Sequence, residues 1–130
     1  MREYLIVKTK EKLGEALYAD KDFKIGDVVL ILEGELTEHP TRHSIELSEK
    51  EHITDKDVGR CLNHSCDPNT VIDKATKTVR AIKPITKGDE LTFDYNANET
   101  EMATPFKCEC GATGATKCQG FIGGRREKNS

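Results

Sequence analysis

The cysteines constrain this chain more than any other feature, because four of the five are spaced so that they can meet on one metal ion. Cys108, Cys110 and Cys118 supply three thiols within a short C-terminal span, and Cys61 and Cys66 lie much earlier. Cys-x-Cys spacing in a chain that starts without a recognisable signal peptide favours a metal or free thiols over a disulfide framework. The sequence therefore predicts that distant segments are brought together near the C-terminus.

A tetrahedral zinc ion needs a fourth ligand besides Cys108, Cys110 and Cys118. Cys66 lies in the polar, loop-like run 63–69 (Asn-His-Ser-Cys-Asp-Pro-Asn), whereas Cys61 is followed by Leu62. We therefore assign Cys66 as the fourth ligand and Cys61 as a small buried hydrophobic residue. Reduced thiols without a metal are the alternative interpretation of the same spacing.

Short apolar runs separated by turn residues predict a mostly β domain of several small sheets with little helix. We expect strands at 4–7, 16–19, 28–32, 71–72, 78–82 and 91–95. The continuous aliphatic run 28–32 predicts a strand buried on both faces. Within 91–95, Phe93 and Tyr95 are expected on one face, because side chains alternate along a strand. The segment 35–56 is polar, and only 44–47 is expected to form an edge strand.

Length and charge limit the class of protein. A chain of 130 residues accommodates one ordinary domain. The first residues are too interrupted by charge for a signal peptide, so we expect an intracellular protein, and no apolar run is long enough for a membrane span. A net charge of −3 argues against direct nucleic-acid binding. His39 and His43 are expected at the surface, because Pro40 disfavours a helix that would align them as ligands.

Asn63, His64 and Tyr95 have two interpretations when taken by themselves. Asn before a turn often caps backbone groups, a single His in a core segment often only packs, and a strand Tyr often places its hydroxyl at the surface. The other interpretation is a polar ligand pocket. The residue types alone do not specify a reaction.

The order of three motifs carries a resemblance to a known family. Residues 63–69, then 90–95 (Glu-Leu-Thr-Phe-Asp-Tyr), then Cys108-Glu109-Cys110 with Cys118 resemble the core of SET-domain protein lysine methyltransferases with their cysteine-rich post-SET segment. The resemblance extends over nearly the whole chain. It implies a SET-domain fold of several small sheets, with residues 1–104 as the SET domain, a reduced insert at about 36–58, a zinc segment at 105–123 and a flexible tail at 124–130.

The resemblance implies transfer of a methyl group from S-adenosylmethionine to a lysine of a protein, such as a histone or another basic tail, with di- or trimethylation allowed because Phe93 leaves room. It places Tyr95 and Phe93 at the reacting centre. It assigns the cofactor to Gly14, Glu15, Ala16, Asn63, His64 and Phe106, and zinc to Cys66, Cys108, Cys110 and Cys118. In the family a second Gly and a Tyr stand at the positions of Ala16 and Leu32.

Two further expectations follow from these departures and from the short insert. A homodimer or a partner protein is expected to complete the wall of the substrate groove. A catalytically weak or inactive SET-like domain that acts as a binding or regulatory module is the alternative function.

Overall fold

The chain folds into short strands that pair in small sheets, as the sequence predicts. The computed structural model describes residues 4–10, 14–41, 43–48, 50–100, 102, 106–107 and 121–122. In chain order the elements are β1 (Leu5–Lys10), β2 (Gly14–Ala19), β3 (Val28–Ile31), β4 (Gly34–Thr37), β5 (Ile45–Ser48), β6 (Glu51–Asp55), the 3-10 helix η2 (Val58–Cys61), β7 (Asn63–His64), β8 (Thr70–Asp73), β9 (Thr78–Ala81), β10 (Thr92–Phe93), α1 (Tyr95–Asn98), β11 (Phe106–Lys107) and β12 (Phe121–Ile122).

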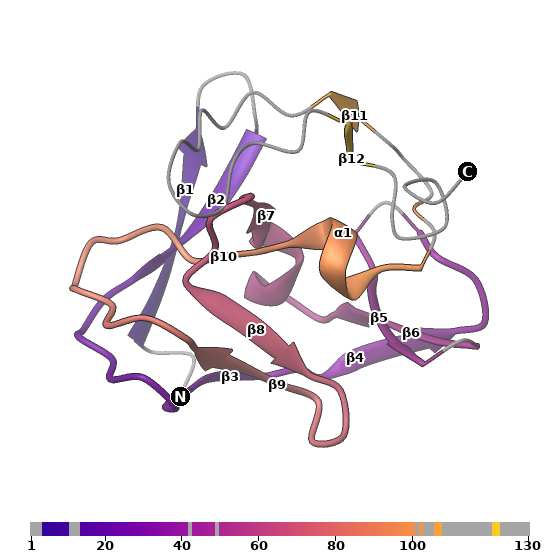
Figure 1. The fold of residues 1–130 in the computed structure, drawn as a ribbon, viewed down its shortest axis with the longest axis horizontal. Coiled ribbons are helices and arrows are strands. Elements are labelled where there is room, and N and C mark those ends of the chain that lie inside the picture. The colour runs from indigo at the N-terminus through magenta and orange to yellow at the C-terminus, as the bar shows by residue number, and fades with distance from the viewer. Residues whose placement is uncertain are drawn as a thin grey trace.

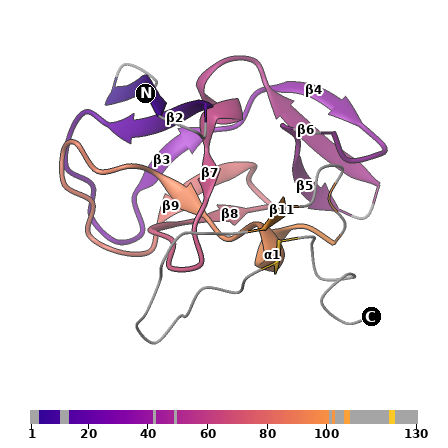
Figure 2. The same cartoon turned by 90° about the horizontal axis from the view of Figure 1, so that it is seen from above.

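Five sheets of two or three strands are formed by the described residues: β1-β2, β3-β9-β8, β4-β6-β5, β7-β10 and β11-β12. Figures 1 and 2 place the β1-β2 hairpin and the β4-β6-β5 sheet on opposite sides of the molecule, with β7 between them. β7 and β10 pair in parallel, with Asn63 opposite Thr92 and His64 opposite Phe93. This central pair brings two distant sequence motifs side by side.

The strands predicted at 4–7, 16–19, 71–72 and 78–82 are confirmed, and they form two hairpins whose apolar faces join one core. β1 pairs antiparallel with β2, and β8 with β9. Val29 and Leu30 of β3 are almost completely buried, but Ile31 is 47% exposed, so the prediction that the whole run 28–32 is buried on both faces was wrong. Ile31 is the last residue of β3 and lies opposite Thr78 of β9.

The polar segment 35–56 contains more structure than the sequence predicted. The expected edge strand at 44–47 corresponds to β5 at one edge of its sheet, but β4 and β6 were missed. β6 buries His52 and Asp55 beside Ile53, so its pattern does not alternate between apolar and polar residues. Asp55 is buried because its carboxylate accepts from the backbone N–H groups of Glu33 and Gly59, an arrangement that only the folded chain supplies.

The strand predicted at 91–95 ends early. β10 contains only Thr92 and Phe93, and Tyr95 begins the short helix α1. Asp94 ends the strand because its side chain caps this helix, accepting from the backbone N–H of Ala97 at 3.3 Å. The predicted strand to Tyr95 was therefore wrong in its second half. The expected pairing of the two rings is nevertheless confirmed, since the Phe93 and Tyr95 centroids lie 4.7 Å apart.

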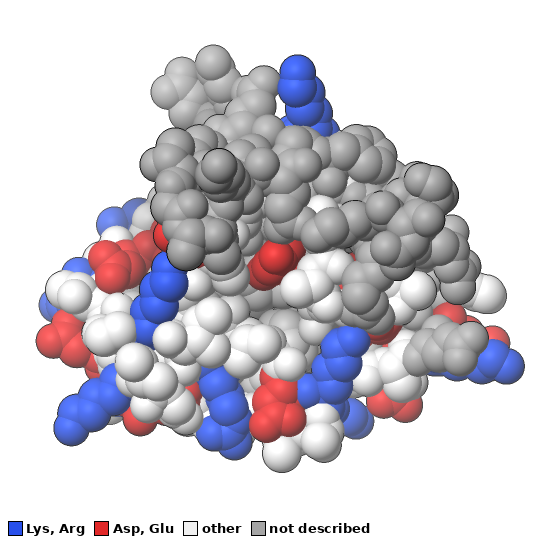
Figure 3. Space-filling view, viewed as in Figure 1, with Lys and Arg blue, Asp and Glu red and all other residues white. Residues whose placement is uncertain are grey.

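Most of the predicted zinc segment 105–123 lies outside the described residues, including Cys108, Cys110 and Cys118, as does the tail 124–130. The described helices include none long and apolar enough to span a bilayer. On the face shown in Figure 3, described Lys and Arg side chains are interspersed with Asp and Glu. The expectation of no direct nucleic-acid binding stays a prediction.

Candidate active site

Asn63 joins two of the segments predicted to hold a cofactor. Its side-chain Nδ2 donates to the backbone carbonyl of Glu15 at 3.1 Å and to Oε2 of Glu90 at 3.3 Å. Gly14 beside it has a positive φ of 78°, and a Cβ added there would meet no atom within 4 Å, so this backbone borders open space. Ala16, two residues further along β2, is completely buried.

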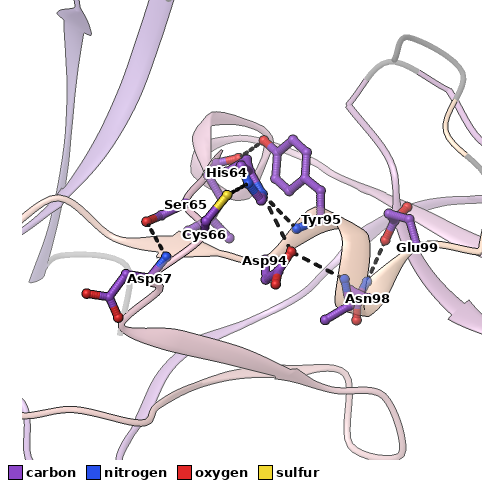
Figure 4. Close-up of polar contacts among 10 residues, drawn as sticks. His64, Ser65, Cys66, Asp67, Asp94, Tyr95, Asn98 and Glu99 are labelled. Atoms are coloured by element: carbon purple, nitrogen blue, oxygen red, sulfur yellow. Dashed lines mark hydrogen bonds and ion pairs between the residues drawn. The ribbon is translucent and has the colours of Figure 1, made fainter. Parts of the chain in front are cut away.

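His64 is held by a contact at each ring nitrogen. Nδ1 accepts from the backbone N–H of Tyr95 at 3.0 Å, and Nε2 lies 3.1 Å from the sulfur of Cys66 (Figure 4). A backbone N–H can only donate, so the neutral ring carries its proton on Nε2 and donates it to Cys66. Burial lowers the pKa of His64, although the Asp94 carboxylate acts in the opposite direction, and this supports the neutral ring.

Three aromatic rings meet beside this histidine. Tyr95 lies edge-on to His64 at 5.2 Å, and Phe106 lies 6.0 Å from His64 and 6.1 Å from Tyr95. Phe93 packs on the other side of Tyr95. The structure thus brings together the two residues predicted at the reacting centre and the aromatic residue predicted to contact the cofactor.

Tyr95 is half-buried, and its hydroxyl donates to the backbone carbonyl of Leu62 at 2.5 Å. Burial, reinforced by the negative charges of Glu99 and Glu90, raises the pKa of Tyr95 above its ordinary value. The phenol therefore stays protonated at physiological pH. It can act as a hydrogen-bond donor and as a fixed dipole, and it is not a phenolate base.

A cavity of about 40 Å³ opens on the Tyr95 side of this cluster. Its wall combines aromatic residues of the centre with the short insert, and the residues lining it are Pro40, Thr41, His43, Ser44, Ile45, Gly59, Arg60, Leu62, Phe93, Tyr95, Glu99 and Met102. The insert at 36–58 therefore supplies one wall of the cavity. His39 and His43 are exposed as predicted, and His43 also lines this cavity. Leu32 belongs to the core and is not part of the wall.

Sequence reasoning missed a buried polar cluster behind the cavity, formed by Glu46, Lys74, Asn98 and Glu99. Lys74 Nζ contacts Oε2 of Glu46 at 2.9 Å and the backbone carbonyl of Asn98 at 2.8 Å. The backbone N–H of Glu46 donates to Oε2 of Glu99 at 2.9 Å, and the Asn98 amide donates to the same oxygen. These residues come from β5, the β8-β9 turn and α1, so no local spacing could have revealed the cluster.

The two carboxylates of this cluster titrate in opposite directions. Burial alone would raise the pKa of Glu46, but hydrogen bonds from Lys74 and Thr100 lower it to about 2. Burial raises the pKa of Glu99 to about 7, against the hydrogen bonds from Glu46 and Asn98. Lys74 contacts Glu46 directly and not Glu99, which accounts for the difference.

Cys66 is buried and lies where the C-terminal segments converge. Its hydrophobic neighbours are Ile122 of β12 together with Tyr95, Met102 and Phe106. Phe106 and Ile122 are paired residues of β11 and β12, which flank the other three predicted ligands in sequence. Cys61 packs against the main core instead, but it is half-buried, so the prediction that it is a buried residue was wrong in extent. The described residues contain no group of three or more His, Cys, Asp or Glu side chains placed for a metal.

Known proteins share both sequence and fold with this chain. The chain is 34% identical over 152 residues to the H3 lysine-36 specific histone-lysine N-methyltransferase of Chaetomium globosum, a match that covers 94% of this chain and 16% of that protein. The methyltransferase domain of human SETMAR superposes with a TM-score of 0.67 and 22% identity, covering 92% of this chain and 58% of that chain.

KRYPTONITE, solved with DNA, an H3(1-15) peptide and SAH, also has a TM-score of 0.67, at 23% identity over 91% of this chain and 29% of that chain. At these identities the two structures show a shared fold of small β sheets. The family profile described as the SET domain matches residues 14–96. Because this match spans more than half of the chain and includes Gly14, Asn63, His64, Phe93 and Tyr95, the chain belongs to the SET domain family.

Proposed function

We propose that this chain is the catalytic domain of an S-adenosylmethionine-dependent protein lysine N-methyltransferase. The observation that carries the proposal is the parallel pairing of β7 with β10. It sets His64 directly opposite Phe93, which lines the cavity with Tyr95. Asn63, the preceding residue, lies beside the open backbone at Gly14. A methyl donor on one side and a lysine on the other would meet across this pair.

The residues fit the two ligands. The exposed backbone at Gly14 and Glu15 and the Asn63 side chain offer polar groups to a cofactor, and Phe106 offers a ring face beside His64. S-adenosylmethionine would supply the transferable methyl group. Lysine has an ordinary pKa of about 10.4, so presenting its neutral amine near pH 7 costs roughly 4 to 5 kcal/mol. A buried channel lined by Phe93 and Tyr95 reduces this cost, because burial disfavours the charged ammonium.

A lysine in a basic protein tail is the substrate class that the comparisons favour. The Chaetomium relative is named as a histone-lysine methyltransferase, and the KRYPTONITE structure contains a histone H3 peptide and SAH. Phe93 faces the cavity without a hydroxyl, which leaves room for an amine that already carries methyl groups. We therefore propose di- or trimethylation of a histone-like tail as the outcome.

We further propose that Cys66, Cys108, Cys110 and Cys118 bind one zinc ion. The support is the position of Cys66, which packs with Phe106 and Ile122 next to the strands that flank the other three cysteines. Zinc would fix the C-terminal segment against the His64-Cys66 turn. Phe106 would then be held beside the cofactor site.

A module that binds the cofactor without transferring its methyl group is the second candidate. Leu32 favours it, because the family has a tyrosine at this position and Leu32 packs in the core, so it offers no hydroxyl to the site. The two candidates differ in methyl transfer and not in cofactor binding.

Calorimetry with S-adenosylmethionine on zinc-loaded protein, followed by transfer of a radiolabelled methyl group to histones, tests the proposal. The wild type should bind the cofactor and transfer the label. Tyr95→Phe should keep binding and lose about 10² to 10³ of the rate, since it removes one preorganised dipole. Tyr18→Phe is the matched control, because Tyr18 lies on β2 away from the cavity and contacts Lys8. Absence of cofactor binding would contradict the proposed methyltransferase function. Cofactor binding without methyl transfer would establish the second candidate.

A further inference from the structure

Glu99 places a carboxylate in the wall of the cavity that would hold the substrate lysine. It follows the last turn of α1, and its backbone N–H donates to the Tyr95 carbonyl at 2.8 Å. Glu99 is only 4% exposed, yet it lines the cavity together with Phe93 and Tyr95. A buried carboxylate beside the proposed amine site is unusual, because Glu side chains are rarely buried unless they are paired.

The hydrogen bonds of Glu99 are distributed unevenly between its two oxygens. Oε2 accepts both the backbone N–H of Glu46 at 2.9 Å and the amide of Asn98 (Figure 4 shows the second). Oε1 takes no part in these two bonds, and Glu99 lines the cavity, so Oε1 is the oxygen available to a ligand there. The carboxylate is therefore anchored through one oxygen and offers the second to a ligand.

The charged groups around Glu99 come from every neighbouring element. Glu46 of β5 lies behind it and is paired with Lys74 of the β8-β9 turn, with the buried His52 of β6 opposite Glu46. His43 and Arg60 line the cavity in front. Burial is the largest influence and raises the pKa of Glu99 to about 7, with the Glu46 charge adding to it and Lys74 opposing it. Such a carboxylate exchanges a proton readily near neutral pH.

We propose that Glu99 accepts the proton that the substrate ammonium must lose before methyl transfer. The inference rests on the proposed function. An N–H bond of the ammonium breaks and an O–H bond forms on Oε1 of Glu99, which leaves a neutral amine. The amine lone pair then bonds to the methyl carbon while the carbon–sulfur bond of the sulfonium breaks, producing a methylated ammonium and a neutral thioether. Glu99 returns its proton to water through the mouth of the cavity.

Glu99→Gln separates this role from a structural one. The amide oxygen of glutamine can take the place of Oε2 and keep both anchoring hydrogen bonds. Only the oxygen that faces the cavity becomes an NH₂ group, which cannot accept a proton. Melting temperature and calorimetric cofactor affinity would confirm that the variant is folded.

The decisive measurement is kcat against pH from 6 to 10 with saturating histone peptide and S-adenosylmethionine. We expect the wild type to lose rate below a midpoint near 7. E99Q should be about 100-fold slower at pH 7, in the range that a general base contributes, and the deficit should shrink as pH rises and the lysine loses its proton to solvent. A structural defect would instead lower the rate equally at every pH.

His43→Gln is the matched control, because the His43 imidazole lines the same cavity as Glu99. The variant should keep the decline of kcat at low pH, called here the acid limb, with its midpoint near pH 7. Loss of that limb in H43Q, or an E99Q profile that matches the wild type, would overturn the inference while the proposed function stands. An inactive wild type would overturn the proposed function and this inference together.

If E99Q does not fold, a measurement on the wild type tests whether Glu99 accepts the proton. The substrate lysine is replaced by aminoethylcysteine, whose amine is less basic because of its sulfur. An acid limb that keeps its midpoint near 7 with both peptides belongs to the enzyme and supports Glu99. A midpoint that moves with the basicity of the amine belongs to the substrate and contradicts the inference.

Discussion

The backbone N–H of Tyr95 donates to Nδ1 of His64 at 3.0 Å. Nε2 of the same ring lies 3.1 Å from the Cys66 sulfur, so His64 connects Tyr95 to Cys66. The bond fixes the tautomer of His64, so its other nitrogen donates to the Cys66 sulfur. One imidazole ring thus connects the centre of the site to the cysteine predicted to bind zinc. Substitution of Cys66 should therefore change the affinity for the cofactor.

Replacing Cys66 by Ser should remove zinc and weaken cofactor binding together. Cys66 packs with Phe106 and Ile122, so loss of the metal loosens the segment that holds Phe106 beside His64. We expect about tenfold weaker S-adenosylmethionine binding, a typical coupling between linked sites. Metal analysis and calorimetry measure the two effects.

Cys61→Ser is the matched control for this experiment, because Cys61 packs on the main core. It should keep the zinc content of the wild type. Unchanged cofactor affinity after chelation of the zinc would show that the two sites are not coupled.

Asn63→Ala should weaken cofactor binding more than it weakens the fold. The variant loses the bonds to the Glu15 carbonyl and to Glu90 at a half-buried position beside open space. We expect the Kd for S-adenosylmethionine to increase about tenfold. This corresponds to about 1.4 kcal/mol, the size expected when the cofactor loses one hydrogen bond to the protein.

Asn69→Ala provides the contrast to Asn63→Ala. Asn69 joins two backbone positions, donating to the Glu90 carbonyl at 2.8 Å and accepting from the Thr92 N–H at 3.0 Å. This variant should lower the melting temperature more than Asn63→Ala does. If both variants changed melting temperature and Kd in the same proportion, Asn63 would be a structural residue only.

Phe93→Tyr should restrict the extent of methylation. The Phe93 ring is buried against Tyr95 and lines the cavity, so an added hydroxyl takes up space and supplies a hydrogen-bond partner for a less methylated amine. Mass spectrometry of a histone peptide should show di- or trimethyl product for the wild type and mainly monomethyl product for the variant. A wild type that stops at monomethyl after long incubation would contradict the role given to Phe93.

The buried carboxylates predict how stability depends on pH. The pKa of Glu46 is lowered to about 2, so its contribution is present above the unfolded value of 4.5 and is lost as pH falls toward 2. The pKa of Glu99 is raised to about 7, so its contribution is present below pH 4.5 and is lost as pH rises through 7, a change on the order of 3 kcal/mol.

Thermal melts at a series of pH values distinguish the two groups. Glu99→Gln should flatten the decline between pH 4.5 and 7, and Glu46→Gln should flatten the loss of stability at lower pH. An E99Q curve that keeps the wild-type slope between pH 4.5 and 7 would assign that slope to another group.

Two similar turns show which structural features local sequence can predict. Residues 23–27 and 85–89 each begin with an apolar residue and end in Gly-Asp. In both turns the Asp carboxylate accepts from the backbone N–H three residues earlier, at Lys24 and at Thr86. The glycines have φ of 92° and 97°. The turns could be predicted because these bonds lie within a few residues, but the pairing of Phe23 with Ile85 could not.

The sequence by itself determined the β class and the strands of the two hairpins, and the resemblance to the SET family implied that Asn63 and His64 lie near the Gly14 segment, Phe93 and Tyr95. These features depend on alternation, turn residues and motifs whose order is visible in the chain. β10 ends at Phe93 because the Asp94 side chain accepts a hydrogen bond from the Ala97 N–H and caps α1. This local bond competes with continuation of the strand.

Only the tertiary structure decided that Glu99 lines the cavity. Its environment is formed by Glu46, Lys74 and Asn98, which come from three separate elements, and β4 and β6 hold the insert that closes the other wall. Burial of a polar side chain is favourable only when its partners are already in place. Those partners lie far apart in sequence, so the final position of Glu99 depends on the assembled sheets.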